Sequence, residues 1–246
     1  MLRYKLISCE VFTRETCMAI ATSPHLVDPE FTPKESHTYP EVLRGDIQKR
    51  ITQAENDPHF DYDAILLGFG LCGNSVLGLQ TEKLPLVIPR AHDCCTIFLG
   101  SKARFLEEFK DRLSCPWSSP GYQERVRKGT KSLEYVSSAY KDLTDQYGED
   151  NAAYIWATLH PNDKHEHIFI DIPELSHLGH LERFKASPDR QEPVVLQGDM
   201  RLLRILVSQD WVTVPVVDAL ADEFLVVPPG RSITASYDME KILGYE

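Results

Sequence analysis

The fold is decided by the stretch "LPLVIPRAHDCCTIFLGSK", residues 84–102. Its first part, LPLVIP, is a short apolar run without polar alternation, which is typical of a strand buried on both faces. A histidine, an aspartate and two cysteines follow directly at residues 92–95, and Ser101 is a good N-cap for a helix behind them. A buried strand that leads through reactive side chains into a helix indicates an α/β protein.

Similar apolar runs recur along the chain. Strands are expected at residues 4–8, 64–69, 85–89, 168–172, 193–197 and 224–228. Helical patterns separate them, at residues 13–21, 40–55, 101–113, 122–143, 150–160, 173–185 and 200–208. Residues 22–40, with four prolines, are expected to form an irregular loop. This alternation predicts an α/β fold with a mostly parallel sheet or sheets and flanking helices.

The length of 246 residues suits one large domain or two small lobes. Three expected strands lie before residue 100 and three lie after residue 165. Two organisations therefore stay open. One is a single α/β domain over residues 1–246, and the other is a pair of Rossmann-like lobes, 1–112 and 113–246, around a cleft.

Composition excludes several classes of protein. The net charge of −11 repels phosphate backbones, so we expect no nucleic-acid partner. No apolar run is long enough to span a bilayer and the N-terminus does not resemble a signal peptide, so we expect a cytoplasmic protein without a membrane partner. Six cysteines are too few for a disulfide scaffold of this size. In a reducing compartment they are core thiols, metal ligands or nucleophiles.

Reactive residues follow each of the first three expected strands. They are Cys9 and Glu10 after the first, Gly70, Cys72, Gly73 and Asn74 after the second, and His92, Asp93 and Cys94 after the third. Ligands of open α/β sheets bind beyond the carboxyl ends of the strands. If these strands are parallel neighbours, about 5 Å apart, then Cys9, Cys72, His92 and Cys94 converge.

Cysteine and histidine are the preferred ligands of zinc. We therefore predict a zinc site formed by Cys72, His92 and Cys94, with Cys9 as fourth ligand or neighbour. Three thiolates would also suit an iron–sulfur cluster. Asp93 could hold the His92 ring by a hydrogen bond.

The glycines of GFGLCGNS allow a tight turn and a close approach of a ligand to backbone amides. Gly70, Gly73 and Asn74 are therefore candidates for binding a cofactor. A helix beginning near Asn74 would lower the pKa of Cys72, which makes Cys72 a candidate catalytic thiolate. Glu10 and Asp93 are candidate catalytic carboxylates, whereas Cys95 is expected to be part of the core.

At AILLGFGLCGNS, LVIPRAHDC, GDMRLL and FLVVPPG the chain resembles DUF1638, a bacterial and archaeal family of unknown function. The resemblance extends over nearly the whole length. It implies an α/β fold and, because members are often found beside corrinoid-dependent methyl-transfer proteins, a corrinoid or methyl-transfer protein as partner. The family pattern also carries a cysteine after the first strand, which matches Cys9, but commonly has glycine where this chain has Glu10.

These observations lead to one main hypothesis and three alternatives. The main hypothesis is a zinc-dependent enzyme that acts on a small polar molecule or a thiol, by methyl or other one-carbon transfer or by a lyase or hydrolase step. The alternatives are a metal-free enzyme with Cys72 and Cys94 as acid and base, a non-catalytic metal or cofactor carrier, and an iron–sulfur protein.

Overall fold

The structure is a computed structural model. It describes residues 1–34, 39–110, 115–126, 143–144, 146–159, 166–186, 192–236 and 241–246. The chain forms two compact units, which are described separately. The first contains Met1–Lys102 together with Met200–Glu246, and the second contains Ala103–Asp199.

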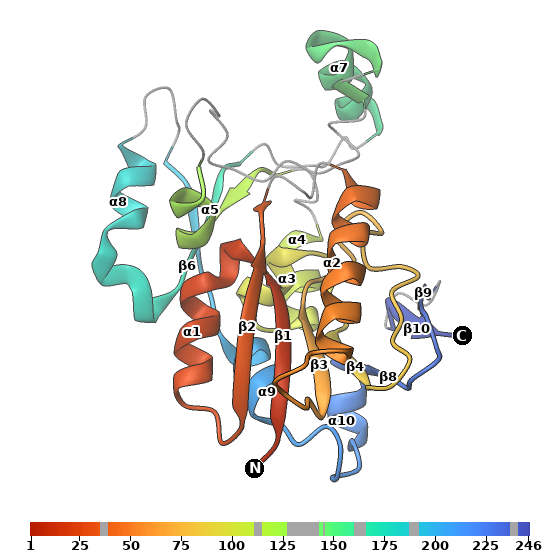
Figure 1. Ribbon diagram of the computed structural model, residues 1–246. Helices are drawn as coiled ribbons and strands as arrows, with labels where there is room; N and C mark the ends of the chain where they lie inside the picture. Colours follow the sequence, from red (N-terminus) through yellow and green to blue (C-terminus); the bar gives the residue numbers. More distant parts are fainter. Residues whose placement is uncertain are drawn as a thin grey trace. The chain divides into compact units, whose positions relative to one another are not determined.

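The first unit is built on a five-stranded sheet in the order β2-β1-β3-β4-β8 (Figure 1). The strands are β1 (Arg3–Cys9), β2 (Leu26–Thr32), β3 (Ala64–Gly68), β4 (Leu86–Pro89) and β8 (Phe224–Val227). The first four are parallel to their neighbours, and β8 runs antiparallel to β4. The predicted α/β fold with a mostly parallel sheet is confirmed, and β1, β3 and β4 are adjacent, as the expected site requires.

Helices cover both faces of this sheet. They are α1 (Thr13–Ala21), α2 (Pro40–Glu55), α3 (Cys94–Leu99), α9 (Arg201–Ser208) and α10 (Asp218–Ala221), with a 3-10 turn, η1 (Glu10–Phe12), before α1. Tyr4 points to the face of α1 and α9, where its hydroxyl donates to the carbonyl of Gln209 at 3.1 Å. Its neighbour Lys5 points to the opposite face and pairs with Glu30, which also pairs with Arg50 of α2. The helices α1 and α2 therefore lie on opposite faces.

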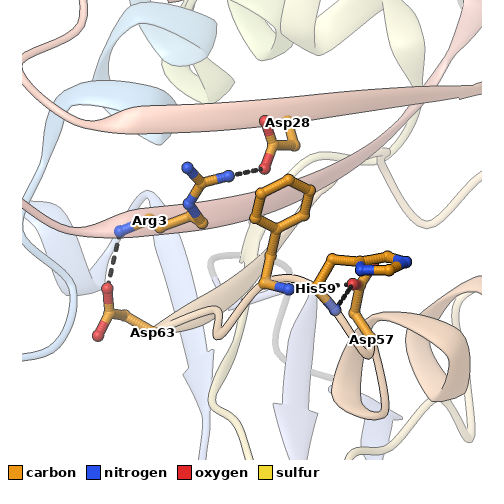
Figure 2. Close-up of polar contacts among 6 residues, drawn as sticks. Arg3, Asp28, Asp57, His59 and Asp63 are labelled. Carbon is orange, nitrogen blue, oxygen red and sulfur yellow. Dashed lines mark hydrogen bonds and ion pairs between the residues drawn. The ribbon is translucent and has the colours of Figure 1, made fainter.

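The strand β2 was not predicted, because the polar, proline-containing sequence LVDPEFT has the composition of a loop. It forms at the edge of the sheet, where Pro29 needs no partner for its missing N–H. Its acidic residues pair with basic residues of β1. Asp28 accepts from Arg3 at 2.8 Å, and the backbone N–H of Arg3 donates to Asp63 at 2.7 Å (Figure 2). These contacts hold the amino-terminal end of β1 to β2 on one side and to the residue before β3 on the other.

Two expected helices differ in the structure. The helix expected from Ser101 forms as α4 (Lys102–Phe109), but an unexpected helix, α3, precedes it, and the two are separated at Gly100 with a φ of 73°. The helix expected over 173–185 is divided at Gly179. Both glycines adopt the left-handed conformation that ends helices. Most of the helix expected over 122–143 lies outside the described residues.

The second unit contains the parallel sheet β5-β6-β7. Its elements are β5 (Trp117–Ser118), α5 (Pro120–Glu124), α7 (Glu149–Leu159), β6 (Ile168–Asp171), η3 (Pro173–Leu178), α8 (His180–Lys185) and β7 (Val194–Gln197). The buried His180 ring lies 3.0 Å from Glu124 and 2.7 Å from the Arg183 guanidinium. The contact with Glu124 joins α8 to α5.

The C-terminal segment completes the first unit. After β8 it forms an antiparallel pair, β9 (Ile233–Ala235) and β10 (Leu243–Tyr245). Arg90, directly after β4, donates to the carbonyls of Ala221 and Lys241 at 2.8 Å. In the part of the chain that the structure describes, no helix is long and apolar enough to cross a membrane.

Stability should fall at alkaline pH because of Tyr4. Burial raises the pKa of its hydroxyl to about 12, from 10.0. The unfolded chain therefore loses this proton first, so the stabilisation is complete below about pH 10 and is lost as the pH rises towards 12. We expect the unfolding free energy of Tyr4→Phe, measured in urea, to decline less steeply than that of wild type between about pH 9.5 and 11.5. Parallel declines would contradict this role of Tyr4.

Candidate functional site

The strand order creates a switch point between β1 and β3. From β1 the chain passes through α1 to β2 on one side, and it returns through α2 to β3 on the other side of β1. At such a point the connecting helices leave on opposite faces, and ligands bind beyond the carboxyl ends of the strands. Cys9 is the last residue of β1, and the loop with Cys72 follows β3. The candidate residues therefore lie where this topology places ligands.

Backbone bonds join the loops after β3 and β4. The N–H of Leu71 donates to the carbonyl of Ala91 at 2.8 Å, and the N–H of Cys72 donates to that of His92 at 3.0 Å. These bonds continue the pairing of the two strands beyond their ends. Gly70 permits the close approach, since a Cβ added there would lie 2.8 Å from the backbone of Asp93.

The segment that follows is a turn and not the expected helix. Cys72, Gly73 and Asn74 have φ values of 45°, 65° and 70°, and residues 72–78 form turns. Successive left-handed residues cannot begin a right-handed helix, so the predicted helix near Asn74 is wrong. Arg44 of α2 donates to the carbonyl of Asn74 at 2.8 Å and holds the turn. The segment behind Cys72 therefore supplies no helix start that would favour a Cys72 thiolate.

Three thiols meet at this edge of the sheet. The Sγ atoms of Cys72 and Cys94 are 3.9 Å apart, and the Cys9 side chain forms a hydrogen bond with Cys94. All three residues are buried, with exposed fractions of 1%, 8% and 2% for Cys9, Cys72 and Cys94. The hydrogen bonds with Cys72 and Cys9, followed by burial, raise the pKa of Cys94 well above its usual value.

Asp93 and His92 stand between β4 and this cluster. Asp93 caps α3 by accepting from the N–H of Thr96 at 3.2 Å. Burial, then the charge of Cys72, raise the pKa of Asp93 to about 7. Burial and the nearby Lys102 lower the pKa of His92. His92 contacts Cys72 through its backbone carbonyl, and a role of its ring as metal ligand stays a prediction.

Glu10 and Cys95 border the cluster. Glu10 accepts a hydrogen bond from the backbone N–H of Lys34 at 2.8 Å, which ties the chain after β2 to the end of β1. This bond gives Glu10 a structural role, and its catalytic role stays a prediction. Cys95 is fully buried, as expected of a core residue, and burial raises its pKa well above the usual value.

The distance between two of the sulfurs fits a metal ion. Tetrahedral zinc with zinc–sulfur bonds of about 2.3 Å places its sulfur ligands roughly 3.8 Å apart. The separation of Cys72 and Cys94, 3.9 Å, agrees with this value. Among the described residues, however, no three His, Cys, Asp or Glu side chains already stand in an arrangement that would hold a metal ion. Two sulfurs are thus spaced for zinc, and the third ligand would have to turn towards it.

Comparison with known proteins gives a family. One family model, described as "Protein of unknown function (DUF1638)", matches residues 31–171, which is more than half of the chain. The chain belongs to the DUF1638 family. The match to DUF1638 includes Cys72, His92 and Cys94, whereas Cys9 lies before it. No curated protein and no solved structure matches this chain.

One residue at the site of this DUF1638 protein was not anticipated. Thr32, the last residue of β2, pairs in register with Cys9 and is fully buried. Nothing in the sequence marks Thr32, because the segment around it has the composition of an irregular loop. Recognition of the strand was needed to place Thr32 beside the cysteines.

The loop junction predicts opposite effects for two glycine substitutions. Gly70→Ala should lower the free energy of unfolding by about 2 kcal/mol, because its Cβ would overlap the Asp93 backbone. Gly45→Ala should raise it by about 1 kcal/mol, because Gly45 lies in the interior of α2 with nothing within 4 Å of an added Cβ. Urea unfolding measures both. Equal stability of Gly70→Ala and wild type would contradict the close approach of the loops.

Proposed function

We propose that this protein is a zinc-dependent enzyme in which Cys9, Cys72 and Cys94 hold the ion, and that it acts on a small polar molecule or a thiol. The observation that carries this proposal is the meeting of three buried thiols, with Cys72 and Cys94 at 3.9 Å. Thiolates so close together repel one another, and water is too scarce to screen them. A soft divalent cation relieves this repulsion, and thiolates are preferred ligands of zinc.

The ligand set favours a particular chemistry. Three thiolates carry three negative charges against the two positive charges of zinc, so the site as a whole is negative. Such an ion would lower the pKa of bound water only weakly. It would still lower the pKa of a coordinated thiol. We therefore favour a substrate thiol at the fourth position. His92 is the other candidate for that position.

The reaction that follows is transfer of a methyl or other one-carbon group to that thiol. The substrate thiol loses its proton to solvent. Its sulfur then forms a bond to the carbon with its own electron pair, while the bond from carbon to the donor breaks and the donor keeps that pair. A corrinoid or a methyl-transfer protein is a suitable donor, and this partner rests on the resemblance of the family. Asp93 and Glu10 would orient the substrate, and free thiols of this kind suit a cytoplasmic protein.

The distance between the sulfurs disfavours the two-thiol acid–base alternative. Such an enzyme holds the substrate carbon between its sulfurs, with each sulfur in contact with that carbon or its hydrogen. Contacts of non-bonded heavy atoms are about 3.5–4.0 Å long, so a separation of 3.9 Å leaves no room for a carbon between them. The same separation is compatible with two sulfur ligands of one metal ion.

Metal content and turnover test the proposal together. Protein purified without chelators should contain about one zinc ion per chain. Zinc affinity should fall by more than about 100-fold in each of the variants Cys9→Ser, Cys72→Ser and Cys94→Ser. This is more than the loss of a residue that only hydrogen-bonds to a metal ligand usually costs. With a methylated corrinoid and a small thiol, wild type should consume the free thiol, and the three variants should lose this activity together with their metal.

Cys17→Ser is the matched control, because Cys17 is an exposed cysteine of α1. It should keep both zinc and activity. Wild type that purifies anaerobically with iron and a brown colour is an iron–sulfur protein, and this result would overturn the choice of zinc. Zinc bound without turnover of any thiol would favour a carrier over an enzyme.

A further inference from the structure

A buried hydroxyl without a partner lies beside the thiols. Thr32 has no exposed surface, and its Oγ1 forms no hydrogen bond within the part of the chain that the structure describes. Buried polar groups are nearly always hydrogen-bonded, because an unpaired one costs free energy. The hydroxyl of Thr32 is therefore expected to gain a hydrogen-bond partner when the protein binds its ligand.

The sheet places Cys9 next to this hydroxyl. Cys9 of β1 and Thr32 of β2 are partners in the parallel register. Paired residues of neighbouring parallel strands project from the same face, with their Cα atoms about 5 Å apart, which is the spacing of the strands. A sulfur and an oxygen on such neighbours can reach hydrogen-bond distance by rotation about a single bond in each side chain.

The ion pair between Lys5 and Glu30 confirms this assignment of faces. Their side chains meet at 2.9 Å on the face covered by α2. Cys9 lies four residues after Lys5, and Thr32 lies two residues after Glu30. Because side chains alternate between faces along a strand, both residues share the face of that ion pair.

We propose that Thr32 is a positioning residue, whose hydroxyl donates a hydrogen bond to the Cys9 sulfur when Cys9 binds the metal. This inference rests on the proposed thiolate site. A thiolate is a stronger acceptor than a thiol, since a hydrogen bond to a charged group is about twice as strong as one between neutral groups. Binding of the metal by Cys9 therefore supplies the partner that the hydroxyl lacks.

The hydrogen bond has two consequences for the site. It selects the Cys9 rotamer, which matters because no three ligands yet stand in a metal-binding arrangement among the described residues. It also withdraws electron density from the sulfur. Groups that hydrogen-bond to metal ligands commonly contribute 10- to 100-fold to metal affinity.

Cobalt(II) substitution tests Thr32 with a readout that a merely structural role would not change. Co²⁺ bound by thiolates absorbs through charge transfer from sulfur to metal. In Thr32→Val, which keeps the shape and removes the hydroxyl, this band should move to longer wavelength, because the sulfur holds its electrons less tightly. Affinity for Co²⁺ should fall about 10-fold. Thr32→Ser keeps the hydroxyl and should restore both the band position and the affinity.

Thr16→Val is the matched control, because Thr16 of α1 is also fully buried with a hydroxyl that has no hydrogen-bond partner among the described residues. It should leave the cobalt spectrum unchanged. Metal-free Thr32→Val should be no less stable to urea than wild type, since it removes an unpaired polar group. An unshifted spectrum and unchanged affinity in Thr32→Val would overturn the inference while leaving the thiolate site intact. Wild type that gives no thiolate-to-cobalt band would overturn the site itself, and Thr32 with it.

Discussion

The structure of this site depends on the contact between two backbones. The loop after β3 and the loop after β4 lie so close that a single added carbon at Gly70 would overlap Asp93. Two hydrogen bonds, from Leu71 and Cys72, then hold the loops in register. Because Cys72 lies in the first loop and Cys94 begins α3 directly after the second, this contact brings their sulfurs to 3.9 Å. A side chain at residue 70 would separate the thiols.

The sheet supplies the third thiol. Cys9 is the last residue of β1, which lies beside β3 at the switch point. In the strand order, Cys9 and Cys94 therefore lie on opposite sides of Cys72. The same order places Thr32 beyond Cys9. One polar side chain thus lies at or just beyond the carboxyl end of each of the four parallel strands, in the order β2, β1, β3 and β4. These side chains are Thr32, Cys9, Cys72 and Cys94. The DUF1638 match begins at residue 31, so it includes Thr32 but not Cys9.

Much of this arrangement could be predicted from the sequence. The uniformly apolar runs at 64–69 and 85–89 predict buried parallel strands. The reactive residues directly after them predict a site at the carboxyl ends of these strands. The strand β2 could not be predicted, because it is stabilised by pairing with β1 and by ion pairs such as Lys5–Glu30, which are tertiary contacts. The turn at 72–74 cannot be distinguished from a helix start in the sequence, because the sequence does not reveal that Cys72 and Asn74 adopt positive φ.

X-ray absorption at the zinc edge tests the central claim most directly, because it counts the sulfur atoms bound to the ion. For zinc-loaded wild type, the account predicts about three sulfur neighbours at roughly 2.3 Å and one lighter atom, with one sulfur fewer in Cys72→Ser. A shell of only nitrogen and oxygen neighbours near 2.0 Å, or a sulfur count unchanged in Cys72→Ser, would contradict it.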